Sequence, residues 1–229
     1  MPRVQAEGKD NVICFITAVN NAEKYNESLE TWKQLDVPQG MAVESLVIDG
    51  ALSMTEAYQQ GMEQAEAKYK IYIHQDVWIM QKNFLQVMVD AFRQDEQLGL
   101  AGVVGSKNIP ASGIWWEGEL IGCICDNHFS DLQMRTFLYE RSSKKVMEAA
   151  AVDGLLLMTQ YDVPWRTDLF KNWHFYDISQ CLEFRRRGYT VGLLPQLVPG
   201  VYHWCNSKAL DENYEEARRI FIHEYAESF

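Results

Sequence analysis

The sequence lacks any apolar run near the roughly 18 residues that a membrane-spanning helix needs. Its N-terminus, MPRVQAEGKDN, also lacks the apolar stretch of a secretory signal. Positive charge is scarce, because 21 Lys and Arg residues stand against 32 Asp and Glu residues and give a formal net charge of −11. This sign argues against a protein that coats nucleic acid or an anionic membrane. We expect a cytoplasmic protein with no transmembrane segment and no nucleic-acid partner, and homo-oligomers remain open.

Cysteine is also scarce, with five residues in a chain of 229. An odd and sparse count is unlike a secreted disulfide scaffold and favours a reducing compartment. Cys123 and Cys125 alternate in the stretch GCICDNH, with His128 nearby, and could indicate a metal site. No second cysteine pair follows at zinc-ligand spacing, so we expect these two cysteines to be buried strand residues instead.

The remaining composition, 47% hydrophobic and 23% charged, is that of an ordinary globular protein, and we interpret residues 1–229 as one domain. Apolar, β-branched runs predict buried strands at 11–19, 44–50, 69–74 and 98–105. Apolar residues at helical spacing lie between these runs, and Ser53 is a candidate N-cap. This alternation predicts an α/β fold with a mostly parallel central sheet flanked by helices.

Residues 106–150 break the alternation with Pro, several Gly and the adjacent pair Trp115 and Trp116. We expect an irregular insert there, with strand-like patches at 120–125 and 134–139 separated by turn residues. We expect both tryptophans to pack in the core, although aromatic faces also line carbohydrate sites. Regular structure resumes with strands at 150–159, 190–194 and 198–203, a helix from about Asp177 to Arg187, and a final helix over 211–225 within a C-terminal helical extension, 205–229.

Ligands of such folds bind beyond the carboxyl ends of the strands, so the polar residues there are the candidates. His74 and Asp76 follow the third strand, and residues two apart in an extended chain point the same way. An imidazole and a carboxylate so placed could share a divalent cation. The alternative is that Asp76 caps a turn and His74 is a hydrogen-bonded residue at the strand end. The other residues after the first three strands are Asn20, Asn21, Asp49 and Gln75.

Several segments, taken in order, resemble the nucleotide-sugar-dependent glycosyltransferases of the GT-A fold, family 2 type. The similarity is greatest to the branch typified by the StrF-like proteins of streptomycin biosynthesis. It covers about residues 11–203 and rests on FITAVNNAEKYNESLETW, IDGALSMTEAYQQGM, KIYIHQDVWI, LAGVVGS, AVDGLLLMT, FYDISQCLEFRRRGYTVGLLP and VPGVYH. The resemblance implies the GT-A fold.

The resemblance also implies a metal site and a catalytic base. Asp76 matches the last Asp of the family's DxD motif, which holds Mn²⁺ or Mg²⁺ on the nucleotide diphosphate, while His74 replaces the first Asp in an HQD form. His203 in VPGVYH matches a third ligand. Asp177 matches the base that deprotonates the acceptor hydroxyl, with His174 as a second candidate. The alternative for Asp177 is an ordinary carboxylate in the first turn of a helix.

Further positions match residues that bind the nucleotide-sugar. Asp49 matches an acidic residue that contacts the base or ribose, and Asn20, Asn21 and Gln75 lie where the family's loops approach the nucleotide. Asp153 matches a position that lines the donor-sugar side of the pocket, and the Gly after it permits close backbone approach. A tight turn at Asp153 and turn-closing roles for the loop residues are the alternatives.

The resemblance therefore implies a hexosyltransferase that moves a sugar from a nucleoside-diphosphate sugar to an acceptor hydroxyl. It also implies inversion, assistance by a divalent metal, and a role in bacterial polysaccharide or glycoconjugate biosynthesis. A non-catalytic nucleotide-sugar binding or scaffolding protein of the same fold is the alternative, favoured by the missing first Asp. A sugar-phosphate nucleotidyltransferase would need a Gly-rich phosphate loop with Arg and Lys after the first strand, which this sequence lacks.

Overall fold

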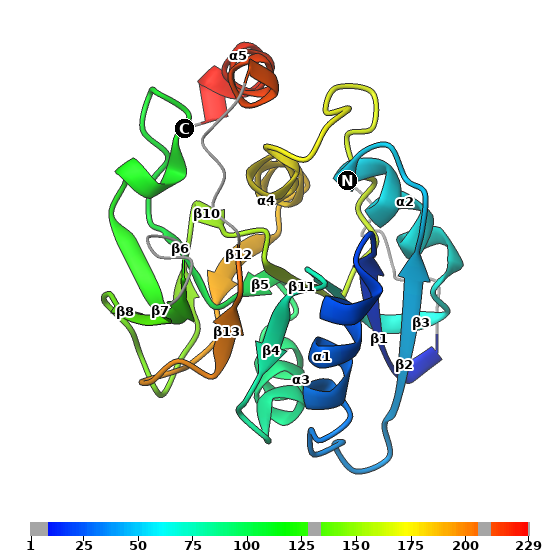
Figure 1. Ribbon diagram of the computed structural model, residues 1–229. Helices are drawn as coiled ribbons and strands as arrows, with labels where there is room; N and C mark the ends of the chain where they lie inside the picture. The colour runs from blue at the N-terminus through cyan, green and yellow to red at the C-terminus, as the bar shows by residue number, and fades with distance from the viewer. Residues whose placement is uncertain (1–8, 128–133, 206–211, 229) are drawn as a thin grey trace.

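The computed structural model describes residues 9–127, 134–205 and 212–228. A seven-stranded central sheet has the order β2-β1-β3-β11-β5-β12-β9. Its strands are β1 (Lys9–Ala18), β2 (Ala42–Ile48), β3 (Ala67–Ile73), β5 (Leu98–Gly102), β9 (Met147–Glu148), β11 (Leu156–Thr159) and β12 (Thr190–Leu193). Figure 1 shows these strands between layers of helices, which confirms the predicted α/β class.

The central sheet is mostly parallel, as predicted: β1, β2, β3, β5 and β12 run in one direction, and β9 and β11 run in the other. Strand β1 is parallel to β2 and β3, and β12 is parallel to β5. Strand β11 lies between β3 and β5 and is antiparallel to both. Strand β2 forms an edge of the sheet, and only Ile48 of its seven residues is buried, although the apolar run at 44–50 predicted a buried strand.

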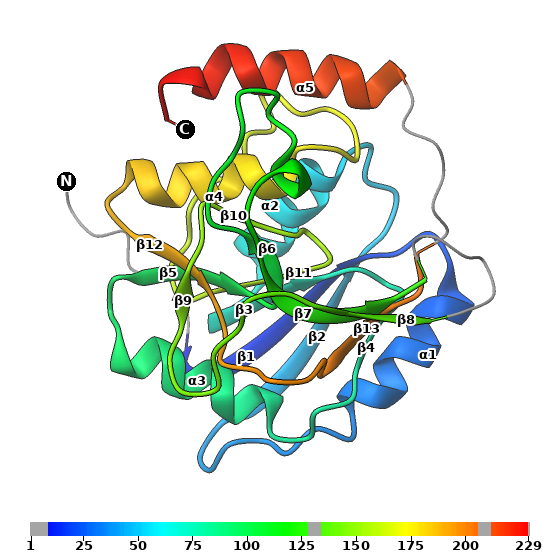
Figure 2. The same ribbon diagram turned by 90° about the vertical axis from the view of Figure 1, so that its left-hand side faces the viewer.

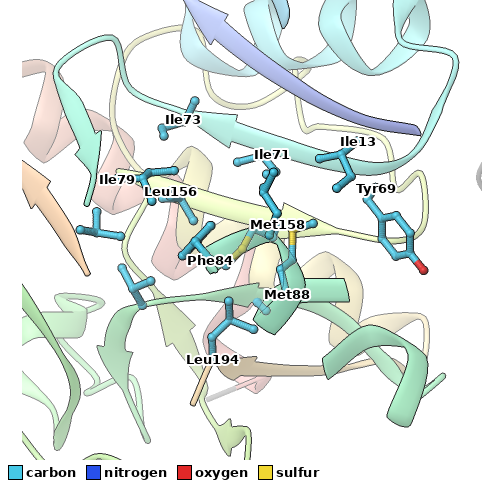
Figure 3. Packing of buried hydrophobic residues seen from close by; sticks show 14 of the residues in the cluster. Ile13, Tyr69, Ile71, Ile73, Ile79, Phe84, Met88, Leu156, Met158 and Leu194 are labelled. Atoms are coloured by element: carbon cyan, nitrogen blue, oxygen red, sulfur yellow. The ribbon is translucent and has the colours of Figure 1, made fainter. Parts of the chain in front are cut away.

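Helices cover both faces of the sheet. Helices α1 (Ala22–Trp32) and α3 (Phe84–Gln94) pack on one face, and α2 (Met54–Gln64) and α4 (Tyr176–Arg186) pack on the other (Figure 2). The Ser53 side chain accepts a hydrogen bond from the Glu56 amide, as an N-cap does, which confirms the predicted start of α2. Figure 3 shows the α3 side of the core, where Phe84 and Met88 face apolar residues of β3 and β11.

The two strand-like patches predicted within the insert form strands, β7 and β8, with turns and loops around them. Strands β6 (Val104–Ser106), β7 (Leu120–Asp126), β8 (Arg135–Leu138) and β10 (Ala151–Val152) join β4 (Val77–Ile79) and β13 (Val201–His203) in a second sheet. The insert joins this sheet through β7, which pairs with β13, and β13 pairs in turn with β4. Cys123 and Cys125 are buried on β7, as expected, whereas His128 lies outside the described residues.

The two tryptophans of the insert form the short helix η1 (Trp115–Glu117). Trp115 is half-buried and packs against the buried cluster that contains Phe175 and Tyr214, whereas Trp116 is 43% exposed, so the prediction of core packing was wrong for Trp116. None of the core clusters of the described residues includes Trp116.

Helix α5 (Glu212–Tyr225) packs across α4, with the short helix η2 (Ala226–Ser228) after it (Figure 2). Arg166 connects the two helices through ion pairs with Glu183 of α4 at 3.3 Å and Glu224 of α5 at 3.0 Å. Phe175, just before α4, has a φ of 61°, a left-handed conformation that non-glycine residues seldom adopt. None of the helices in the described ranges combines the length and apolar character needed to cross a membrane.

Candidate functional site

His74, Asp76 and His203 converge at one end of the central sheet. Each offers one ligand atom, and these atoms all lie within 4.8 Å of one another. His74 and Asp76 belong to the turn between β3 and β4, while His203 ends β13, which pairs antiparallel with β4 so that His203 lies opposite Val77. The Trp204 amide also donates to the Asp76 carbonyl at 2.9 Å. Strand pairing therefore brings residues 127 positions apart in the sequence, 76 and 203, to one point.

In this buried cluster Asp76 and His203 carry opposite charges and His74 is neutral. Burial, with a smaller effect from His203, lowers the pKa of His74 from 6.5 to about 4, so its imidazole is neutral near pH 7. Burial would also lower the pKa of His203, but its contact with Asp76 at 3.5 Å outweighs this and raises the value to about 10. Burial disfavours the Asp76 carboxylate, yet His203 keeps the Asp76 pKa below its ordinary value.

The donor set of the cluster fits a divalent metal. The carboxylate suits Mg²⁺ or Mn²⁺ and the two imidazoles suit first-row divalent ions in general, with the remaining coordination positions open to other oxygen ligands. A cation in this position would replace the protonated His203 as the partner of Asp76, because a ligating imidazole has to be neutral.

Tyr176, the first residue of α4, holds the His74 ring from the opposite side. Its hydroxyl lies 2.5 Å from Nε2 of His74. Burial raises the pKa of Tyr176 well above 10, so the hydroxyl stays protonated. If Nε2 of His74 carries the ring proton and donates it to this hydroxyl, the Nδ1 lone pair remains for a ligand. The sequence FYDIS contained this tyrosine, but its pairing with His74 depends on a contact 102 residues away.

A cavity of about 280 Å³ opens beside the cluster, at the ends of β1, β2 and β3. Five of the predicted site residues line it: Asn20, Asp49, His74, Gln75 and Asp76. Met54, Tyr58 and Trp173 also line it, and no sequence pattern pointed to them beyond the apolar stripe of α2. Tyr58 is fully buried, and its hydroxyl has no hydrogen-bond partner among the described residues.

Gln75 shapes the loop that borders this cavity. Its Oε1 accepts hydrogen bonds from the backbone amides of Asn20 and Asn21 at 2.9 and 2.8 Å, and its Nε2 donates to the Asn20 side chain. The Asn21 side chain caps α1 by accepting from the Lys24 amide, and Asn21 does not line the cavity. Gln75 and Asn21 are therefore placed to hold the loop in shape, while Asn20 and Asp49 face the open volume.

A second and larger cavity, of about 610 Å³, lies between the insert, α4 and α5. Asp153, Asp177 and His174 line this cavity, while Trp173 lines both. Burial, with help from the negative charge of Asp153, raises the pKa of Asp177 from 3.8 to about 7. The Gly154 amide donates to an Asp177 carboxylate oxygen at 3.1 Å.

Gly154, the residue after Asp153, lies against the Tyr176 side chain. A Cβ atom added to Gly154 would overlap the Tyr176 hydroxyl, so only glycine fits there without displacement of that ring. The Asp153 side chain accepts from the Leu155 amide at 3.0 Å, which is the bond of a tight turn. Gln59 of α2 accepts a hydrogen bond from the Trp165 amide and donates one to Glu63, and it lines neither cavity.

Comparison with known proteins finds one matching family model and several solved structures of similar fold. The model of a family described as "Glycosyltransferase like family" matches residues 14–225. No curated protein matches the sequence. Among solved structures, GalNAc-T7 with UDP, GalNAc and Mn²⁺ superposes with a TM-score of 0.61 at 9% identity, over 94% of this chain and 50% of that chain.

Two further structures are similar at comparably low identity. TarS 1-349 of S. aureus in complex with UDP-GlcNAc gives a TM-score of 0.59 at 9% identity, covering 94% of this chain and 66% of that one. The mannosyltransferase PcManGT from Pyrobaculum calidifontis with GDP-Man and Mn²⁺ gives 0.50 at 11% identity, covering 91% and 59%. This chain therefore spans less than two thirds of each of these solved chains, and the likeness establishes the shared GT-A fold.

Proposed function

The chain belongs to the glycosyltransferase-like family whose model matches residues 14–225, and on this premise we propose that it transfers a sugar from a nucleoside-diphosphate sugar to an acceptor hydroxyl. The observation that carries the proposal is the convergence of His74, Asp76 and His203 beside a cavity that adjoins a second one containing Asp177. The solved structures named above contain UDP, UDP-GlcNAc or GDP-Man, which supports a nucleoside-diphosphate hexose as the donor.

In this proposal the smaller cavity holds the nucleotide. Asp49 and Asn20 present a carboxylate and an amide that can hydrogen-bond ribose hydroxyls or a base edge. His74, Asp76 and His203 would hold a divalent ion, which when bound neutralises charge on the departing diphosphate. Mn²⁺ in two of the similar structures supports this assignment. Asp153 lies on the side of the larger cavity, where it can contact the donor sugar.

Asp177 is the proposed base. The acceptor oxygen forms a bond to the anomeric carbon while the bond from that carbon to the diphosphate oxygen breaks, and the hydroxyl proton passes to the Asp177 carboxylate. Attack from the larger cavity and departure toward the smaller one would use opposite faces of the sugar. Such a direct displacement inverts the anomeric configuration.

A transfer assay tests this function. The protein is incubated with UDP-, GDP- and dTDP-hexoses, Mn²⁺ and a panel of hydroxyl acceptors, and both free nucleoside diphosphate and glycosylated product are measured. We expect one donor to be consumed, with an inverted anomeric centre in the product by NMR. Asp177→Asn should reduce turnover by about 10²- to 10⁴-fold while nucleotide binding persists.

Asp36→Asn is the matched control, because this exposed aspartate lines neither cavity. Wild-type turnover in Asp177→Asn would remove Asp177 from the role of base. Nucleotide binding without release or transfer across the whole panel would favour a non-catalytic nucleotide-sugar binding protein.

A further inference from the structure

Trp173 lies where the two cavities meet. It is the one described residue that lines both the smaller cavity, beside His74 and Asp76, and the larger cavity, which contains Asp177. In the proposed reaction the anomeric carbon has to lie between the diphosphate in the smaller cavity and the base in the larger one. The sugar that is transferred therefore occupies the space next to Trp173.

The indole of Trp173 is open to a ligand. The residue is 44% exposed, and among the described residues its ring has no aromatic partner. The six other tryptophans of the chain each pack against another aromatic ring. An indole face can pack against the C–H groups of a sugar ring, and the indole N–H can donate one hydrogen bond. The Trp173 ring is thus available to a ligand at the junction of the cavities.

The backbone on either side of Trp173 is fixed by hydrogen bonds. The Asn172 carbonyl accepts from the Met54 amide, at the start of α2, at 3.1 Å. The Asn172 side chain donates to the Asn213 carbonyl of α5 at 3.2 Å and accepts from the His174 amide at 3.0 Å. Figure 1 shows this segment between α2 and α4. An aromatic side chain on a segment held in this way keeps its position, which the orientation of a substrate requires.

We infer that Trp173 is a positioning residue whose indole packs against the donor sugar at the junction of the two cavities. The nucleotide contacts proposed for Asn20 and Asp49 lie at the ends of β1 and β2, whereas Trp173 also borders the larger cavity. This inference rests on the proposed function, because it concerns the donor of the same reaction. It goes further in assigning to one side chain the part of the donor affinity that depends on the sugar.

The test separates the sugar from the nucleotide. Calorimetric titration in the presence of Mn²⁺ compares UDP with UDP-GlcNAc, and GDP with GDP-mannose. For Trp173→Ala we expect the affinity for the nucleotide-sugar to fall by about three- to tenfold, which is the size of a lost ring contact. The affinity for the bare nucleotide should fall by less than about twofold, because its proposed contacts remain.

Two further variants control this measurement. Trp173→Phe keeps an aromatic face and should retain most of the affinity for the nucleotide-sugar. Trp116→Ala is the matched control, since it removes an indole that is similarly exposed, at 43%, but lines only the larger of the two cavities. It should change neither affinity.

Tryptophan fluorescence gives a second readout. With wild type, the nucleotide-sugar should change the emission beyond the change that the bare nucleotide causes. This additional change should be absent in Trp173→Phe at saturating ligand, although the ligand still binds. Its persistence in that variant would assign the change to another tryptophan and contradict the inference.

The outcomes distinguish the two proposals. Equal losses for the nucleotide and the nucleotide-sugar in Trp173→Ala, or no loss of either, would overturn the inference and leave the proposed function standing. The expected affinities without sugar transfer to any acceptor would overturn the proposed function and leave the role of Trp173 standing in a binding protein. Failure of wild type to bind any of the four ligands would overturn both.

Discussion

The hydroxyl of Tyr176 lies 2.5 Å from Nε2 of His74, and the next residue along α4 is Asp177. The N-terminus of α4 therefore contacts the proposed metal cluster through Tyr176 and supplies the proposed base, Asp177. Gly154 fits this arrangement from the other side, since it leaves room for the Tyr176 hydroxyl and donates to Asp177. The geometry couples the two cavities through a short and buried set of contacts.

Tyr176→Phe tests this coupling. The ring still packs against Tyr58, but the hydrogen bond that orients His74 is lost. Because removal of such an outer partner commonly costs about 10- to 100-fold in metal affinity, we expect a loss of that size in the Mn²⁺ dependence of nucleotide binding. Calorimetric titration of the nucleotide at several Mn²⁺ concentrations measures it. An Mn²⁺ dependence identical to wild type would show that Tyr176 has no role in orienting His74.

The pH dependence of activity follows from Asp177. Its pKa is raised to about 7, and a base must be ionised to accept a proton. We therefore expect kcat/KM to rise with pH up to about 7 and then to level off. A pH profile measured with saturating Mn²⁺ checks this, and the residual activity of Asp177→Asn should lack the same inflection. Retention of that inflection in Asp177→Asn would assign it to another group.

The ionisation of Asp177 also lowers the stability of the folded state as the pH rises. The unfolded chain loses this proton near the ordinary pKa of 3.8, whereas the folded chain keeps it until about 7. The folded state is thus progressively disfavoured between these two pH values, and the penalty is constant above them. Asp177→Asn removes the penalty, so its melting temperature should exceed that of wild type by a margin that grows from pH 4 to pH 7. A margin that shrinks over this range would contradict the direction of the shift.

A buried ion pair at the central sheet gives a prediction for the free energy of unfolding that does not depend on the proposed function. Lys70 of β3 is fully buried and donates to both carboxylate oxygens of Asp162, at 2.7 and 2.9 Å. Asp162→Ala would leave the ammonium buried beside the Ala67 carbonyl with its charge uncompensated, and removal of one partner of such a pair costs about 3–5 kcal/mol. Urea unfolding measures the loss, and Lys70→Met combined with Asp162→Ala should recover part of it. A change below about 1 kcal/mol in the single variant would show that Lys70 finds another partner or reaches water.

Local patterns in the sequence predicted the parts of the fold that depend on neighbouring residues. The apolar run before His74 predicted strand β3, and the spacing after Phe175 predicted α4 to within a residue at each end. The HQD stretch alone identified His74 and Asp76 as a pair, and the resemblance added His203. The three side chains do lie together in the folded chain, although their role as metal ligands stays a prediction.

Other features depended on contacts between distant segments, which local periodicity does not encode. The antiparallel direction of β11 depends on its pairing with β3 and β5, and the second sheet depends on β13, which pairs with β7 of the insert and with β4. The exposure of Trp116 follows from its place on η1, outside the core. The StrF-like branch and the cytoplasmic location likewise stay predictions.

The most direct test of the proposed nucleotide site is a thermal-shift measurement with UDP, dTDP, GDP and CMP, each with and without Mn²⁺, on wild type and on Asp76→Ala. A ligand that binds only the folded state raises its melting temperature, so the predicted result is a rise with one nucleoside diphosphate that requires Mn²⁺. That rise should be absent in Asp76→Ala and present in Asp36→Asn. A shift that persists in Asp76→Ala, or no shift with any nucleotide, would contradict the assignment of His74, Asp76 and His203 to a metal-dependent nucleotide site.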